Sequence, residues 1–211
     1  MSSFNGSAWS AEGQLSWGRG TSGVTQYSPA IATYGQLPIV AWTTRTGPID
    51  ISLGAAHGWN KPKLLLNQGV GAGDVHTSYA PALGDSALNN DLHVAWTNGD
   101  GSIGTLIDDP ITGTPADEQT VPSASTGAAP AIASSGEAVY LAWSARTTGA
   151  LGYSTTWTYD NNFHGWTKPA FEPQATTHLA PCLAVNGFDV TLGWTAAGAT
   201  TIDDAAATTP Y

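Results

Sequence analysis

Apolar and polar positions along the chain follow the short alternation of β-strands, and no segment combines a helical period with helix caps. Long runs such as "LPIVAWTT" at 37–44 and "AVYLAWSA" at 138–145 are rich in β-branched and aromatic residues. A shorter run, "PAIA" at 29–32 and 130–133, precedes each of them across a Gly-containing turn. The pattern predicts antiparallel strands joined by tight turns, and therefore an all-β fold.

The same pattern recurs four times along the chain, at intervals of about fifty residues. The prolines that open the short runs are Pro29, Pro81, Pro130 and Pro181. The tryptophans within the long runs, which we expect in the core between repeats, are Trp42, Trp96, Trp143 and Trp194. Four-stranded units of this length are typical of β-propeller blades. We expect one propeller domain over residues 1–211, with blades at about 27–66, 79–122, 128–172 and 179–211.

The two ends of the chain predict how the propeller closes. The last repeat has room for three strands only, and the segment 5–16, which overlaps "GSAWSAEGQLSW" at 6–17, supplies a fourth. Pairing the two ends would remove exposed sheet edges. We therefore expect a closed four-bladed β-propeller whose N-terminal strand completes the last blade, rather than two chains forming an eight-bladed ring.

Alternate repeats are more similar to each other than neighbouring repeats are. Repeats one and three share "HGWNKP" at 57–62 and "HGWTKP" at 164–169, whereas repeats two and four share "TLIDD" at 105–109 and "TTIDD" at 200–204. This predicts pseudo-twofold ABAB pairs of blades. Because the HGW motif opens an outer strand, we interpret it as part of the scaffold rather than as a duplicated binding site.

The charge balance argues against polyanionic partners. The chain has 6 Lys and Arg against 16 Asp and Glu, which gives a net charge of −10. Such a chain repels phosphate backbones, so we expect no nucleic-acid partner. Its apolar runs fall short of the ~20 residues that a membrane-spanning helix needs, so we expect no membrane insertion.

Two further features concern the cellular setting. The first residues, "MSSFNGSAWS", lack the basic stretch and apolar core of a secretory signal. We expect a soluble protein, either cytoplasmic or exported by a route without such a signal. Cys182 is the only cysteine, and its apolar strand predicts that it is buried and unreactive.

The blade sequence "SPAIA", "LPIVAWTT" and "ISLGAAHGWNKP" resembles the blades of sialidase-like and lectin-type β-propellers. Sialidase blades carry an Asp-box, Ser-x-Asp-x-Gly-x-Thr-Trp. The segment Ser52–Trp59 keeps its Ser and Trp but has Gly54 and Ala56 where the motif has Asp and Gly. The resemblance implies a propeller fold whose ligands bind on the face opposite this motif.

The residues for catalysis by such a family are sparse. A sialidase needs an arginine triad on one face. In this chain such a triad would require every arginine there is, Arg19, Arg45 and Arg146. The paired carboxylates Asp108–Asp109 and Asp203–Asp204 are adjacent on strands, so the members of each pair point to opposite faces. No phosphate loop or metal-ligand spacing is present. We expect no enzyme, no metal and no cofactor.

The turns after the long runs and the links between repeats fall on the face opposite the HGW motif. Two arginines and two histidines recur there about 100 residues apart, and Trp17 in a Gly-rich link is a candidate for ligand stacking. The candidate ligand-binding residues are Arg45, Arg146, His76, His178, Trp17, Arg19, Tyr27, Tyr79 and Asp100. The alternatives are structural: the arginines could bind backbone carbonyls of turns, and the histidines could be polar packing residues.

The leading functional interpretation is a non-catalytic, carbohydrate-binding propeller lectin with a glycan or glycoprotein as its partner. Aromatic faces and hydrogen-bond donors recognise sugars, and repeated blades give several weak sites the avidity they need. The runner-up is a protein-interaction or assembly propeller, and a glycoside hydrolase comes third. A homo-oligomer is left open.

Overall fold

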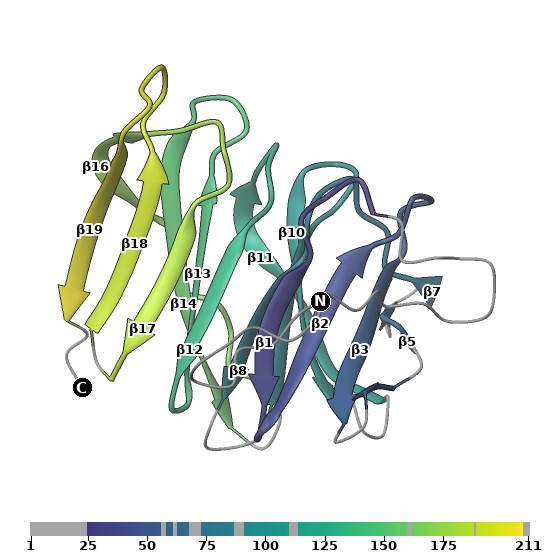
Figure 1. Ribbon diagram of the computed structural model, residues 1–211. Helices are drawn as coiled ribbons and strands as arrows, with labels where there is room; N and C mark the ends of the chain where they lie inside the picture. Colours follow the sequence, from purple (N-terminus) through teal and green to yellow (C-terminus); the bar gives the residue numbers. More distant parts are fainter. Residues whose placement is uncertain are drawn as a thin grey trace, which may run out of the picture.

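A computed structural model describes residues 25–55, 58–60, 63–67, 73–86, 91–109, 114–159, 162–187 and 189–208. Within these residues the chain forms four small antiparallel sheets that stand side by side as the blades of a β-propeller (Figure 1). The sheets follow one another in sequence order, and each begins with the strand that lies innermost. The prediction of an all-β, four-bladed propeller is confirmed at this level.

Each blade is an up-and-down sheet. Blade 1 contains β1 (Ala30–Tyr34), β2 (Leu37–Thr43) and β3 (Ile49–Ala55), with β4 (Gly58–Trp59) and β5 (Lys63–Leu64) on its outer edge. Blade 2 contains β8 (Ala82–Ser86), β9 (Asp91–Thr97), β10 (Ser102–Asp109) and β11 (Thr114–Ser125). Blade 3 contains β12 (Ala131–Ser135), β13 (Ala138–Ser144), β14 (Ala150–Tyr159), β15 (Asn162–Phe163) and β16 (Ala170–Thr176). Blade 4 contains β17 (Cys182–Asn186), β18 (Asp189–Thr195) and β19 (Ile202–Thr208). A small pair, β6 (Leu66–Asn67) with β7 (Gly73–Asp74), lies between blades 1 and 2 in sequence.

The repeated tryptophans of the two middle blades pack flat against glycines of the neighbouring strand. Trp96 lies opposite Gly104, where a Cβ atom would stand 2.4 Å from Cε2 of the indole. Trp143 lies opposite Gly152 in the same way, at 2.7 Å. Both indoles are buried in the core between blades. The strand glycines therefore create the space that lets a large ring fill each joint, as expected of a core position.

A threonine fixes the link that leads into each blade, and it is buried at three of the four links. It occurs four residues before the repeated proline, and its hydroxyl accepts a hydrogen bond from the amide two residues further on. These link threonines are Thr25, Thr77, Thr126 and Thr177. The hydroxyl of Thr43, at the end of β2, donates to the carbonyl of Tyr79 at 2.5 Å, and that of Thr97, at the end of β9, donates to the carbonyl of Ala128 at 2.7 Å. Consecutive blades are thus joined by hydrogen bonds as well as by apolar packing.

The expected closure between the two ends of the array stays a prediction. The inner strands pack in succession, β1 on β8, β8 on β12 and β12 on β17, but no comparable packing joins β17 to β1 among the described residues (Figure 1). The predicted closing strand, residues 5–16, lies outside the described residues. The pseudo-twofold pairing stays a prediction. Cys182 is exposed, so the prediction that it is buried is wrong, because no blade among the described residues covers that side of β17. Trp194 is half-buried and packs against the apolar cluster between blades 3 and 4.

The HGW motif of blade 3 belongs to the scaffold. Trp166 is buried in the core between blades 2 and 3, and its Nε1 donates to Oγ1 of Thr105 on β10 at 3.1 Å. His164 and Lys168 beside it are exposed. In blade 1 only Gly58, Trp59 and Asn60 of the motif lie within the described residues. The indole thus ties the outer edge of blade 3 to blade 2.

A buried histidine makes the stability of the fold depend on pH. His93 on β9 is fully buried, with Nδ1 3.4 Å from Oγ of Ser134 on β12. Burial lowers the pKa of His93 from 6.5 to about 4. The unfolded chain therefore binds a proton that the folded protein excludes between these two pH values, and the free energy of unfolding should fall as the pH falls through that window.

Urea unfolding followed by tryptophan fluorescence should show this loss below about pH 6.5, at up to about 1.4 kcal/mol for each pH unit. The variant His93→Gln has no titrating ring and should lose that part of the pH dependence, while the carboxylates continue to act in both proteins. Identical pH profiles for the two proteins would contradict this account of His93.

Candidate functional site

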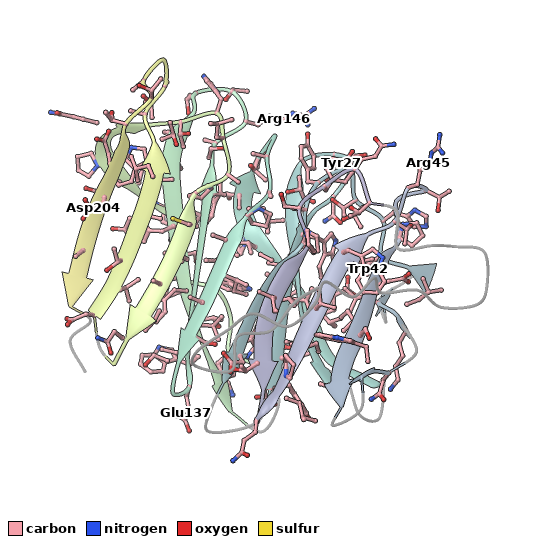
Figure 2. The ribbon with its side chains drawn as sticks, in the orientation of Figure 1. Tyr27, Trp42, Arg45, Glu137, Arg146 and Asp204 are labelled. Atoms are coloured by element: carbon pink, nitrogen blue, oxygen red, sulfur yellow. The ribbon has the colours of Figure 1, made fainter. Side chains whose placement is uncertain are left out.

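The turns β2–β3, β9–β10, β13–β14 and β18–β19 and the links between blades share one face of the array, which we call the turn face. Figure 2 places Tyr27, Arg45 and Arg146 together at this end of the strands. The HGW segments follow the opposite ends of β3 and β14. The turn face therefore contains the described residues that the sequence selected as candidates.

Arg146 bridges two neighbouring blades on this face. It lies in the β13–β14 turn of blade 3, and its Nη1 donates to the carbonyl of Asp100 in the β9–β10 turn of blade 2 at 2.7 Å. Gly101 makes this approach possible: a Cβ there would stand 2.8 Å from Nη1, and the backbone has φ +92°. The side chain is otherwise exposed. A guanidinium has five N–H donors, so most of them remain able to bind a ligand.

Arg45 has the corresponding place in blade 1, two residues after the end of β2, as Arg146 is two residues after the end of β13. Its side chain is exposed and extends from the end of the array (Figure 2). Among the described residues no hydrogen bond or ion pair of this guanidinium is recorded. The repeated arginine therefore donates to a backbone carbonyl of the neighbouring blade in blade 3, and has no such recorded bond among the described residues in blade 1.

The two histidines lie over equivalent turns of blades 1 and 3, although they occupy different positions in their links. His76 comes just before link threonine Thr77, whereas His178 comes just after link threonine Thr177. A Cβ on Gly47 would stand 3.0 Å from Nδ1 of His76, and a Cβ on Gly149 would stand 2.8 Å from Cε1 of His178. Each imidazole thus lies over the glycine of its own blade's turn. The sequence spacing alone did not reveal this convergence.

One arginine and one histidine therefore flank the same turn in blade 1 and again in blade 3. Both histidines and both arginines are exposed. Two polar groups with N–H donors, held beside a rigid turn, form a candidate subsite for a hydroxyl-rich ligand.

Tyr27 and Tyr79 are equivalent residues two positions before their blades' prolines, and both are half-buried. Their amides donate hydrogen bonds to the hydroxyls of Thr25 at 3.0 Å and Thr77 at 3.2 Å, which fixes the backbone of the link. In blade 4 the same position holds Leu179, which is exposed. The sequence did not select this leucine, although its distance from Pro181 identifies it as the counterpart of the tyrosines.

Asp100 is exposed, and its carboxylate accepts hydrogen bonds from its own turn. Oδ1 accepts hydrogen bonds from Oγ of Ser102 at 2.7 Å and from the amide of Ser102 at 2.8 Å. The Ser102 hydroxyl bond is the main reason that the pKa of Asp100 is lowered, and the nearby charge of Arg146 lowers it further. Asp100 is therefore an anion at neutral pH, beside the guanidinium that contacts its backbone.

The remaining points concern two candidate residues, metal binding and membrane spans. Trp17 and Arg19 lie outside the described residues. In the described ranges no group of three or more His, Cys, Asp and Glu is arranged to hold a metal ion. The same ranges contain no helix that is long and apolar enough to cross a membrane.

The pKa of Asp100 tests the geometry of this turn. Ser102→Ala removes the hydroxyl bond and should raise that pKa toward the usual value for an aspartate, and Arg146→Ala should raise it by a smaller amount. Carboxyl carbon chemical shifts followed through a pH titration would measure both changes. An unchanged pKa of Asp100 in Ser102→Ala would contradict the hydrogen-bonded arrangement.

Comparison with known proteins finds similarity in fold only. No family model matches the sequence, and no curated protein matches it. BP39L lectin from Burkholderia pseudomallei superposes with a TM-score of 0.66 at 14% identity, covering 96% of this chain and 57% of that chain. AofleA from Arthrobotrys oligospora gives a TM-score of 0.61 at 14% identity, covering 84% and 52%. A variant of Aleuria aurantia lectin in complex with α-methyl-L-fucoside gives 0.52 at 16% identity, covering 84% and 56%.

The chain therefore spans little more than half the length of these proteins. An α-L-arabinofuranosidase and a sialidase share the fold as well. At such identities the similarity establishes a β-propeller fold found in lectins and in glycosidases. The fold itself does not decide between binding and catalysis.

Proposed function

We propose that this protein is a non-catalytic lectin that binds glycans through the turn face. The observation that carries the proposal is the repeated arginine and histidine beside one turn in blade 1 and one turn in blade 3. Guanidinium and imidazole groups supply donors for sugar hydroxyls. Tyr27 and Tyr79 add half-buried aromatic rings, which can pack on the C–H faces of a sugar.

The proposal includes two similar sites, one around Arg45 and His76 and the other around Arg146 and His178. Two weak sites on one face let a branched or clustered glycan bind with higher avidity than either site alone. The pseudo-twofold repeat expected from the sequence is the simplest origin of such a pair. Lectins that share the fold support a sugar ligand, and the fucoside complex of Aleuria aurantia lectin makes α-L-fucosides the first ligands to test.

A glycan array followed by calorimetry with α-methyl-L-fucoside tests the proposal. Hydrogen bonds to a charged group contribute about 1.5–3 kcal/mol, so Arg45→Ala or Arg146→Ala should weaken binding at its own site by about 10- to 100-fold. The double variant should lose binding. Lys168→Ala removes an exposed positive charge next to the HGW segment and should bind like the unaltered protein.

Other outcomes would identify the competing functions. An array without any bound glycan, together with unchanged ligand affinity in both arginine variants, would contradict the lectin proposal. A stable protein complex that depends on the turn face would favour the interaction propeller instead. Turnover of a chromogenic glycoside would show a hydrolase, which the proposal excludes.

A further inference from the structure

The two arginine sites of the turn face differ in the charge beside the guanidinium. Nη1 of Arg146 donates to the carbonyl of Asp100 at 2.7 Å, so the carboxylate of the same aspartate lies close by. After the hydrogen bonds from Ser102, the charge of Arg146 also contributes to the lowered pKa of Asp100. In the blade 3 site the negative charge of Asp100 therefore offsets part of the positive charge of Arg146.

Arg45 has no such carboxylate beside it among the described residues. The turn 43–48 and the link 75–79, which form the blade 1 site, contain no Asp or Glu. The Arg45 side chain is exposed, and it takes part in no recorded hydrogen bond or ion pair in the part of the chain that the structure describes. It extends outward from the end of the array (Figure 2). Its donors and its charge are therefore available to a ligand.

The imidazole of His76 has a fixed place over the blade 1 turn. His76 forms an isolated β-bridge with Pro48, and a Cβ on Gly47 would stand 3.0 Å from Nδ1 of the ring. Arg45 lies two residues before Gly47 in the same turn. A planar guanidinium binds a carboxylate through two parallel hydrogen bonds, and a ring N–H can donate a further one. The blade 1 site thus has the donors that an acidic sugar needs.

The carboxylate of Asp100 gives the blade 3 site a different preference. Both hydrogen bonds from Ser102 end on Oδ1, and the Asp100 side chain is exposed, so Oδ2 can accept a bond from a ligand. A sugar hydroxyl can donate to this oxygen while a neighbouring hydroxyl accepts from Arg146. A sugar carboxylate at the same place would be repelled by the charge of Asp100.

We propose that the blade 1 site, around Arg45 and His76, accepts acidic sugars as well as neutral ones, whereas Asp100 restricts the blade 3 site to neutral sugars. This inference rests on the proposed lectin function and divides its two sites by ligand class. A glycan with one acidic and one neutral terminal sugar would then engage both sites in a single orientation.

A glycan array of matched pairs tests the division. Each neutral hexoside stands beside its uronide, and each galactoside beside its sialylated form. The unaltered protein should bind members of both sets. Arg45→Gln should weaken the binding of acidic glycans by about 10- to 100-fold and keep neutral binding at the blade 3 site. Arg146→Gln should keep the binding of acidic glycans, because they do not use its site.

A variant of Asp100 tests the restriction directly. Asp100→Asn keeps an oxygen that can accept from Ser102 and removes the negative charge. Added to Arg45→Gln, it should restore the binding of acidic glycans by about fivefold or more, now at the blade 3 site. Glu137→Gln is the matched control, since it removes one negative charge at the opposite end of the strands (Figure 2). It should leave the binding of both sets unchanged.

Three results would overturn the division. Acidic binding that survives Arg45→Gln, or that falls equally in both arginine variants, would show that the sites do not differ by ligand class. An Asp100→Asn chain that gains no acidic binding would show that its charge does not restrict the blade 3 site. In each of these cases neutral binding would leave the lectin proposal standing. An array on which neither set binds would contradict the lectin proposal itself, and this inference with it.

Discussion

The structure depends on the hydrogen bonds that fix each link between blades. At every link a threonine hydroxyl accepts a hydrogen bond from the amide two residues ahead of it, and Thr77, Thr126 and Thr177, between the described blades, are buried. At the two joints between blades 1, 2 and 3 a second threonine, Thr43 or Thr97, donates to the first carbonyls of the next blade. An unpaired buried carbonyl is costly, and the chain entering a new blade has no ladder partner until its strand begins. The threonines satisfy these groups and set the position from which each inner strand starts.

The same links position the turn face. The amides of Thr77, Thr126 and Thr177 donate to the carbonyls of Gly47, Gly101 and Gly149 at 2.7–2.9 Å, so each link is bonded to the turn of the blade before it. The histidines lie directly beside these threonines. In blades 1 and 3 the turn therefore receives its imidazole from a link that is fixed by backbone hydrogen bonds. The geometry of the candidate subsites thus follows from the scaffold of the blade rather than from long side chains that order themselves.

Much of this organisation could be predicted from the sequence because it repeats. The spacing of Pro29 and Trp42 with their counterparts indicated the blades, and the Gly-containing turns indicated which loops share a face. The link threonines repeat four residues before each proline, so the same spacing also indicates them. His76 and His178 could only be compared by distance along the chain, so their approach to equivalent glycines from opposite sides of a threonine was not predictable.

The errors came from the ends of the array, where the environment and not the local pattern decides burial. Cys182 has the same apolar neighbours as Ala30, Ala82 and Ala131, so its strand predicted a buried residue. Its exposure follows from the absence of a described blade beyond β17. Ile202 on β19 is exposed for the same reason. A residue pattern specifies which face of a blade is apolar, but the number of blades available to cover that face is a property of the assembly.

The free energy of unfolding of Thr97→Val is the most direct test of the central claim that threonine hydroxyls lock the joints. Valine keeps the shape and removes the 2.7 Å hydrogen bond to the carbonyl of Ala128, which keeps only the longer bond from Oγ1 of Thr126 at 3.3 Å. The account predicts a loss of about 1–3 kcal/mol in urea unfolding. The exposed turn variant Thr46→Val should change stability by less than about 0.5 kcal/mol. Equal stabilities for the two variants would contradict the account.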